Sequence, residues 1–331
     1  MEGEPRDDDA SSSAGPGAPQ GDLGRPSRRL TIDLDRFDQG DIKMDYGYFG
    51  FNHGALHDAD SITRVVVAAE ELGYESIWTG EHVVLVDPHE APSPVPPETN
   101  FVDTIASLAF AAAKTERIKL GSGIILLPQR NPVVLAKELA GVDVLSKGRL
   151  LFGVGVGYVP REFETMGIPY EERGARMTEH IEAIRELWTA DKPSFDGQFT
   201  QFSGIQSNPR PIQDPHPPIL VGGMSGPALR RAVAQGDGWY GFFMDVDATA
   251  AAIKGLEDAA KSTERREGLD RLTVSVTPPG PVDADTAKRY EDLGVDRLIL
   301  MRGFADMSAS GGDAVDGIVD FLEDQAKLIG G

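Results

Sequence analysis

The stretch at residues 117–158, RIKLGSGIILLPQRNPVVLAKELAGVDVLSKGRLLFGVGVGY, decides the fold. It opens with an apolar run of strand length, 119–127, and closes with a second one, 150–156. Between them, Asn131 and Pro132 predict a helix start, because Asn caps free amides and Pro fits the first turn. Apolar residues then recur at helical spacing. This βαβ unit predicts two parallel strands joined by a right-handed crossover.

The rest of the chain repeats this alternation. Eight strand–helix pairs within about 285 residues predict an α/β fold of the (β/α)8 TIM barrel type with insertions. A doubly wound open sheet is the alternative, but no linker follows residue 44. A short hairpin is predicted at 195–202 with Asp196-Gly197 as its turn. The other predicted strands are 46–51, 76–79, 219–221, 238–241, 273–276 and 297–301, and the other helices are 61–72, 101–115, 171–188, 227–235, 248–261, 284–293 and 314–328.

Composition separates the chain into two parts. Residues 1–43 are acidic and rich in Ser, Gly and Pro, which predicts a disordered N-terminal tail, and residues 44–331 form the predicted barrel domain. Met44 directly precedes the first predicted strand, so one interpretation is that translation starts at Met44 and the start codon has been assigned too far upstream. A tail with a regulatory role is the alternative. The net charge of −21 argues against nucleic acid and anionic membranes as partners. With no cysteine, no apolar run of membrane-spanning length and no secretory signal, we expect a cytoplasmic protein.

Several familiar motifs fail when their spacing is checked. The glycines of GVGVG, 153–157, follow a strand, but Tyr158 and Pro160 occupy the positions where a dinucleotide fingerprint needs its third glycine. No Gly-Lys dipeptide exists, so a P-loop is absent. His53 and His57 are four residues apart but flank Gly54 outside any predicted helix, so no metal site is predicted.

Three other features point to a site at the carboxyl ends of the strands. Glycines cluster in the third and fourth strands, where they either relieve crowding or let the backbone approach a flat ligand. The loop Val221-Gly222-Gly223-Met224-Ser225 runs into a helix, and free amides at a helix start favour an anion, although an ordinary capped turn is the alternative. Glu81-His82 follows the second strand, where histidine can transfer protons. The clustered glycines are Gly121, Gly123, Gly153, Gly155 and Gly157.

Taken in order, these segments resemble the bacterial luciferase-like superfamily of flavin and deazaflavin oxidoreductases. The matching motifs are TGEH, ERIKLGSGIILLPQRNP, KGRLLFGVGVGY, YEERGARMTEHIEAIRELW, FDGQFTQF and PPILVGGMSGPALRRAVAQGDGW. The similarity is greatest to the branch of luciferase-like oxidoreductases that uses coenzyme F420. The resemblance implies a TIM barrel, a homodimer, a small-molecule substrate and F420 as cofactor, with FMN as the alternative.

The resemblance also implies roles for individual residues. His82 matches the active-site histidine, held by Glu81, and residues 86–99 would form a substrate lid. A cis peptide at Gly123–Ile124 would lie against the cofactor ring. Tyr158 occupies a position where related sugar-phosphate dehydrogenases carry a carboxylate, which argues against a glucose-6-phosphate dehydrogenase. Tyr158 would instead hydrogen-bond or stack on cofactor or substrate. The implied cofactor-binding set is Ser122, Gly123, Ile124, Gly155, Gly157 and Tyr158 around the ring, and Gly222, Gly223, Met224 and Ser225 at the phosphate.

Three functions remain open from the sequence. The first is an F420-dependent oxidoreductase that transfers a hydride between the deazaflavin and a small organic substrate, with His82 handling the proton. The second is a monooxygenase that uses reduced FMN and oxygen. The third is a flavin-binding protein without catalysis.

Overall fold

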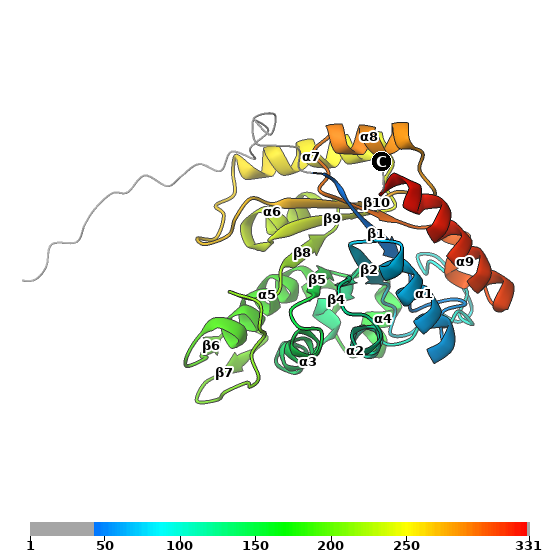
Figure 1. Ribbon diagram of the computed structural model, residues 1–331. Helices are drawn as coiled ribbons and strands as arrows, with labels where there is room; N and C mark the ends of the chain where they lie inside the picture. Colours follow the sequence, from blue (N-terminus) through cyan, green and yellow to red (C-terminus); the bar gives the residue numbers. More distant parts are fainter. Residues whose placement is uncertain (1–42, 330–331) are drawn as a thin grey trace, which may run out of the picture.

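In the computed structural model, which describes residues 43–329, eight parallel strands close into a barrel (Figure 1). Every neighbouring pair is parallel, and the third barrel strand pairs with the fourth to complete the ring. The predicted (β/α)8 barrel is therefore confirmed. The strands are β1 (Asp45–Phe49), β2 (Ser76–Thr79), β3 (Lys119–Ser122), β5 (Leu150–Gly155), β8 (Ile219–Gly222), β9 (Gly238–Phe242), β10 (Thr273–Thr277) and β11 (Arg297–Leu300).

Helices surround these strands, and α9 packs beside α1 on the outside, joining the two ends of the domain (Figure 1). Most of the major helices begin where a polar side chain accepts a hydrogen bond from a first-turn amide, as Asp58, Asn131 and Ser225 do. The major helices are α1 (Ala59–Glu71), α2 (Thr104–Lys114), α3 (Pro132–Leu145), α5 (Arg173–Thr189), α6 (Gly226–Gln235), α7 (Val246–Ala260), α8 (Ala284–Asp292) and α9 (Gly312–Gln325).

The structure departs from the sequence predictions between β3 and α5. The run predicted as one strand at 119–127 breaks after Ser122, and a short β4 (Ile125–Leu126) and a 3-10 turn η2 (Leu127–Gln129) follow it. The peptide bond between Gly123 and Ile124 is cis, as the resemblance implies. After β5 the chain forms two elements that the sequence analysis missed, α4 (Pro160–Thr165) and η3 (Tyr170–Glu172).

The hairpin beside α5 is present, but its predicted turn is wrong. Strands β6 (Phe195–Asp196) and β7 (Gln201–Phe202) pair antiparallel, so residues 197–200 connect them instead of a two-residue Asp-Gly turn. The Glu179 carboxylate from α5 accepts hydrogen bonds from the amides of residues 198, 199 and 200. Together with the hydrogen bond from the Gly197 amide to the Thr200 carbonyl oxygen at 2.9 Å, this carboxylate holds the wider loop. Two short 3-10 turns, η4 (Phe304–Ser308) and η5 (Ala326–Leu328), flank α9.

The barrel interior is filled by its own cluster of large side chains, separate from the core between strands and helices. Its glycines make room for these side chains: a Cβ on Gly121 would lie 2.3 Å from the Trp78 ring, and one on Gly153 would lie 1.9 Å from the Ser122 carbonyl oxygen. Crowding within the barrel therefore accounts for both glycines. The interior cluster comprises Phe49, Trp78, Leu151, Leu220, Tyr240, Ile299 and Met301, with Ile124 and Phe242 packed against it.

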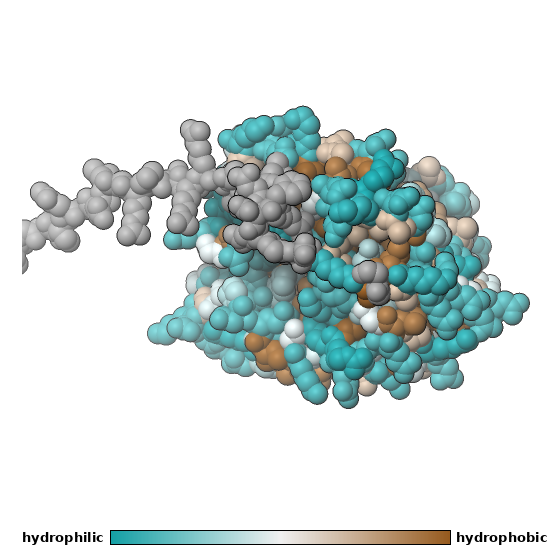
Figure 2. All heavy atoms as spheres, turned by 45° about the horizontal axis from the view of Figure 1, so that its top comes forward, coloured by the Kyte–Doolittle hydropathy of each residue, from teal (hydrophilic) through white to brown (hydrophobic). Residues whose placement is uncertain are grey.

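Hydrophilic residues predominate on the face shown in Figure 2, in line with the acidic composition. None of the helices within residues 43–329 is long and apolar enough to cross a membrane. The same part of the chain contains no group of three or more His, Asp or Glu side chains that could hold a metal ion. The predicted disordered tail lies, except for Lys43, outside the described residues.

Candidate active site

A buried, hydrogen-bonded histidine–glutamate pair lies at the carboxyl end of β2. His82 Nδ1 is 2.7 Å from Glu162 Oε1, and the two side chains are only 9% and 1% exposed. Gln129 Nε2 donates to the other carboxylate oxygen of Glu162 at 3.2 Å. Because Nδ1 is engaged by the carboxylate, Nε2 is the nitrogen left to exchange a proton with a ligand. The arrangement fixes the orientation of a proton-transfer group.

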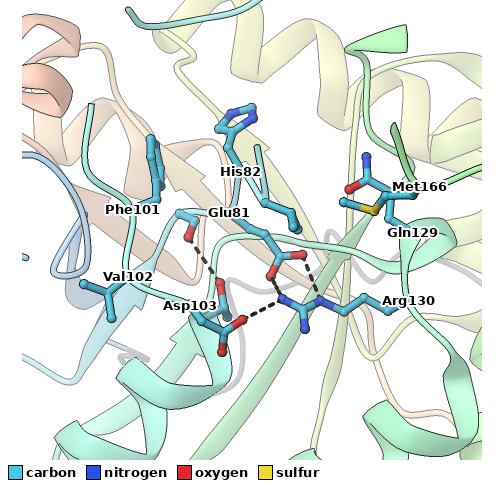
Figure 3. A pocket seen from close by; sticks show the side chains of 11 residues that line it. Glu81, His82, Phe101, Val102, Asp103, Gln129, Arg130 and Met166 are labelled. Atoms are coloured by element: carbon cyan, nitrogen blue, oxygen red, sulfur yellow. Dashed lines mark hydrogen bonds and ion pairs between the residues drawn. The ribbon is translucent and has the colours of Figure 1, made fainter. Parts of the chain in front are cut away.

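Glu81 does not hold His82, which corrects the role that the resemblance implied. The Glu81 carboxylate turns the other way and pairs with Arg130, with an Oε2–Nη2 distance of 2.6 Å and an Oε1–Nε distance of 3.2 Å (Figure 3). It also accepts a hydrogen bond from the Leu126 amide at 2.9 Å. Consecutive strand-end residues point to opposite sides, so Glu81 braces the segment after β3 while His82 faces Glu162.

These side chains border a cavity of about 270 Å³ beside the barrel mouth (Figure 3). Arg130 lies on its wall and bridges Glu81 to Asp103, 3.2 Å away, so its charge is balanced within the wall. The Phe101 ring stands edge-on to the His82 imidazole with 5.4 Å between ring centres. The cavity is lined by Gly80, Glu81, His82, Val83, Phe101, Val102, Asp103, Thr104, Gln129, Arg130 and Met166.

Tyr158 lies on the other side of His82. Its ring is edge-on to the imidazole, with 6.1 Å between ring centres, and it is 49% exposed. Burial, with a smaller contribution from the negative charge of Glu162, raises the pKa of the Tyr158 phenol to about 12. Tyr158 therefore keeps its proton across the working pH range and can act as a hydrogen-bond donor.

A second histidine, His53, is buried beside this group. Neither of its ring nitrogens makes a hydrogen bond within the described structure. Burial lowers the pKa of His53 to about 4, although the carbonyl of Met307 partly offsets this effect. Its ring lies between Phe49 and Phe101, at centre distances of 5.7 and 5.2 Å. His53 is therefore neutral and packs as an aromatic ring.

Most of the residues expected to line the cofactor ring instead contact neighbouring barrel residues. The Ser122 hydroxyl is fully buried and exchanges hydrogen bonds with the backbone of Gly153. A Cβ on Gly155 would lie 2.0 Å from Ile124 Cδ1, and one on Gly222 would lie 2.8 Å from the same atom. Gly155 and Gly222 thus make room for Ile124. The Ser122 side chain, contrary to its predicted role, is unavailable for direct cofactor contact.

The loop after β8 keeps the features of an anion site. Gly223 has φ = 110°, in the left-handed region, and its carbonyl accepts a hydrogen bond from Trp239 Nε1 at 2.9 Å. Ser225 caps α6 through the Ala228 amide. Among the described residues, no hydrogen bond engages the Met224 or Ser225 amides. The Met224 side chain is 61% exposed.

Sequence reasoning missed Glu162, Gln129 and Arg130 as members of the site. Arg130 follows η2, and its position in the quoted PQRNP motif is the one signal that could have marked it. Glu162 sits in the single-turn helix α4, where only one neighbour is a large apolar residue, so no periodicity marks it. His53 was considered only as a metal ligand.

Comparison with known proteins agrees with the barrel fold. A family model described as luciferase-like monooxygenase matches residues 44–316. The chain belongs to this family. Among relatives of this luciferase-like protein, an uncharacterized protein of Mycobacterium tuberculosis is 33% identical over 261 residues, covering 74% of this chain and 86% of the relative.

Two relatives with named activities match over shorter regions. The oxygenase component of the flavin-dependent trigonelline monooxygenase of Acinetobacter baylyi is 35% identical over 164 residues, 49% of this luciferase-like chain and 42% of the relative. The F420-dependent glucose-6-phosphate dehydrogenase of Amycolatopsis mediterranei is 30% identical over 220 residues, 63% and 62% of the two chains. In fold, an F420-dependent secondary alcohol dehydrogenase superposes with a TM-score of 0.69 at 16% identity, over 87% of this chain and 99% of that one. The chain is thus a flavin- or F420-dependent luciferase-like oxidoreductase.

Proposed function

We propose that this protein is a coenzyme F420-dependent oxidoreductase that transfers a hydride between the deazaflavin and a small organic substrate. The observation that carries the proposal is the buried His82–Glu162 pair, 2.7 Å apart at the carboxyl end of β2. In parallel barrels this end is where active sites are built. A fixed imidazole with one free nitrogen suits a reaction in which a proton must move together with a hydride.

The loop after β8 fits the cofactor phosphate. The unpartnered amides of Met224 and Ser225, next to the start of α6, offer donors to an anion. Gly123, Ile124, Gly157 and Tyr158 would surround the ring, and Gly223 would allow the backbone to approach the phosphate. When bound, F420 supplies hydride transfer at its C5 position. His82 would hold or release the proton at Nε2, with Glu162 stabilising the charged imidazole.

The test is a spectral titration of the purified protein with oxidised F420, with FMN in parallel. We expect saturation by F420 in the micromolar range, and turnover with an alcohol or carbonyl panel that disappears in His82→Ala while F420 binding persists. The absence of F420 binding would refute the proposal. Persistent turnover in His82→Ala would refute the role of the histidine.

A monooxygenase that uses reduced FMN is the second proposed function. It is supported by the 35% identity with the oxygenase component from Acinetobacter baylyi. Oxygen uptake with supplied reduced FMN, dependent on an organic substrate, would favour it over the F420 reaction. The remaining proposals from the resemblance are a homodimer and a lid at residues 86–99.

A further inference from the structure

Exposed apolar side chains gather on one end of the barrel. Within residues 43–329, five of the nine large hydrophobic residues with substantial exposure follow the carboxyl end of a barrel strand. Because all eight strands are parallel, these loops lie on the same face. Scattered exposed apolar residues are ordinary, whereas a gathering on one functional face calls for a ligand. The five residues are Val83, Tyr158, Met224, Phe243 and Phe304.

Aromatic rings connect this face into one continuous arc. Phe304 contacts Phe243, Phe243 contacts Phe242, and Phe242 contacts Phe49, with ring centres 5.5, 6.1 and 4.8 Å apart. From Phe49 the chain of contacts continues through His53 and Phe101 to His82 and Tyr158. We define these eight residues as the aromatic arc. Phe49 and His53, in the middle of the arc, are only 4% and 6% exposed, so a ligand would contact its exposed rings. One of these, Tyr158, stands edge-on to the proposed proton-transfer residue His82.

Phe243 supports a ligand-binding role independently. Its backbone has φ = 58°, in the left-handed region that bulky residues seldom adopt, and its side chain is 43% exposed. An unfavourable backbone conformation that exposes an apolar ring to solvent does not stabilise the fold. Such strain is found where the surroundings fix a residue for function.

The charge of the same loops disfavours an anionic ligand on the arc. The segments between each strand end and the next major helix contain three arginines and no lysine, and each arginine lies near a carboxylate. Arg130 pairs with Glu81, Arg161 lies 3.6 Å from Glu164, and Arg302 lies 3.3 Å from Asp306. The same segments contain more carboxylates than arginines, Asp87, Glu90 and Glu98 among them, so their net charge is negative. The arc is therefore apolar and bordered by acidic segments.

We propose that the substrate of this enzyme is an uncharged, hydrophobic organic molecule that packs on the aromatic arc beside His82. This inference rests on the proposed oxidoreductase function and adds the substrate class. It disfavours phosphorylated and carboxylated substrates on the arc, because the arginines of these segments already lie near carboxylates and the segments are acidic overall.

The test uses N-phenyl-1-naphthylamine, an uncharged probe whose fluorescence rises in apolar surroundings, with the full-length protein saturated with F420. We expect saturable binding and displacement by acetophenone at lower concentration than by benzoate or benzyltrimethylammonium. Preferential displacement by either charged compound would overturn the proposal. A probe that binds the protein alone but is fully displaced by F420 would assign the arc to the cofactor ring and overturn the substrate assignment.

Two variants locate the binding. Phe243→Gly removes the ring and accepts the left-handed backbone, so we expect about tenfold weaker probe binding without a fall in Tm. Phe304→Ser, from a separate loop, should weaken binding by several-fold. Leu145→Ser is the matched control, since Leu145 is 67% exposed at the end of α3, on the opposite end of the barrel.

Native probe affinity in both phenylalanine variants, or an equal loss in Leu145→Ser, would overturn the proposal. The proposed function fails separately, through absent F420 binding in its own titration. Probe binding without F420 binding would therefore leave an apolar ligand site on a protein that is not an F420 enzyme.

Discussion

Replacing Glu162 by glutamine should slow turnover without unfolding the site. The wild-type carboxylate accepts from Gln129 Nε2 and pairs with His82 Nδ1. An amide that keeps the Gln129 bond must point its NH2 group at Nδ1. That nitrogen then has to accept, so the proton of the neutral imidazole moves to Nε2, which faces the ligand. The variant thus has the wrong tautomer as well as a missing charge.

The size of the expected fall in kcat follows from the burial of the His82–Glu162 pair. With the two side chains 9% and 1% exposed, solvent screens the pair little. A hydrogen bond to a charged group contributes about 1.5–3 kcal/mol. At 1.4 kcal/mol per tenfold change, we expect kcat to fall by about 10- to 150-fold. F420 affinity should change little, since the amides after β8 that we propose as donors to the cofactor phosphate are untouched.

Two measurements check this expectation. Steady-state turnover gives the rate, and 15N NMR of the histidine rings reports the tautomer without requiring activity. Glu164→Gln is the control, because Glu164 lies on the same helix but is 68% exposed and contacts only Arg161. A Glu162→Gln enzyme with native kcat and an unchanged His82 ring spectrum would refute the positioning role of Glu162.

Three further predictions concern stability. Burial lowers the pKa of His53 to about 4 from the ordinary 6.5, so the free energy of unfolding should fall by up to about 3 kcal/mol as pH drops from 6.5 to 4. Urea titrations should show a smaller pH dependence for His53→Phe than for wild type, and the burial of His180 and His216 accounts for part of what remains. Burial would raise the pKa of Glu75, but its ion pair with Arg297 lowers it to about 2, so the pair stabilises the fold above pH 4.5 and loses this effect toward pH 2. Glu75→Gln should therefore lower the free energy of unfolding by about 3 kcal/mol at pH 7. Equal urea midpoints for the variant and the wild type would contradict this. Gly153→Ala should prevent folding or lower Tm strongly, since its Cβ would lie 1.9 Å from a backbone oxygen. Gly141→Ala, in open space within α3, should instead raise the free energy of unfolding by about 0.5–1 kcal/mol. Thermal unfolding should therefore show Tm changes of opposite sign for the two variants.

The barrel could be predicted from the sequence because its signals are local. Apolar strands and capped helices alternate, and each cap that was recognised, Asn131 and Ser225 among them, is used in the structure. The irregular segments gave no such signal. The run at 119–127 has strand length, and its glycines at 121 and 123 fit a strand as well as a break, so the sequence does not fix the break after Ser122. The hairpin turn was mispredicted because Glu179, distant in sequence, supplies the hydrogen bonds.

The side-chain partners of the site could not be predicted, because they depend on three-dimensional geometry. Glu81 precedes His82 directly and looked like its partner, yet adjacent residues of an extended segment point apart. Arg130 is 49 residues from Glu81 and Glu162 is 80 residues from His82, and only the closed barrel brings these pairs together. The clustered glycines were ambiguous for the same reason: crowding by Trp78, Ser122 and Ile124 requires them, whether or not a ligand is bound.

The position of Tyr158 acquires a different meaning once Glu162 is included. By resemblance, Tyr158 stands where related sugar-phosphate dehydrogenases carry a carboxylate, which argued against a glucose-6-phosphate dehydrogenase. The structure contains a buried carboxylate four residues later, because α4 turns the chain back beneath His82. The carboxylate therefore contacts the histidine, and the ligand side carries an apolar ring that is half exposed. At position 158 this chain has a phenol where the related sugar-phosphate dehydrogenases have a carboxylate. This difference disfavours polar sugars as substrates and is consistent with the hydrophobic substrate that we propose for the aromatic arc.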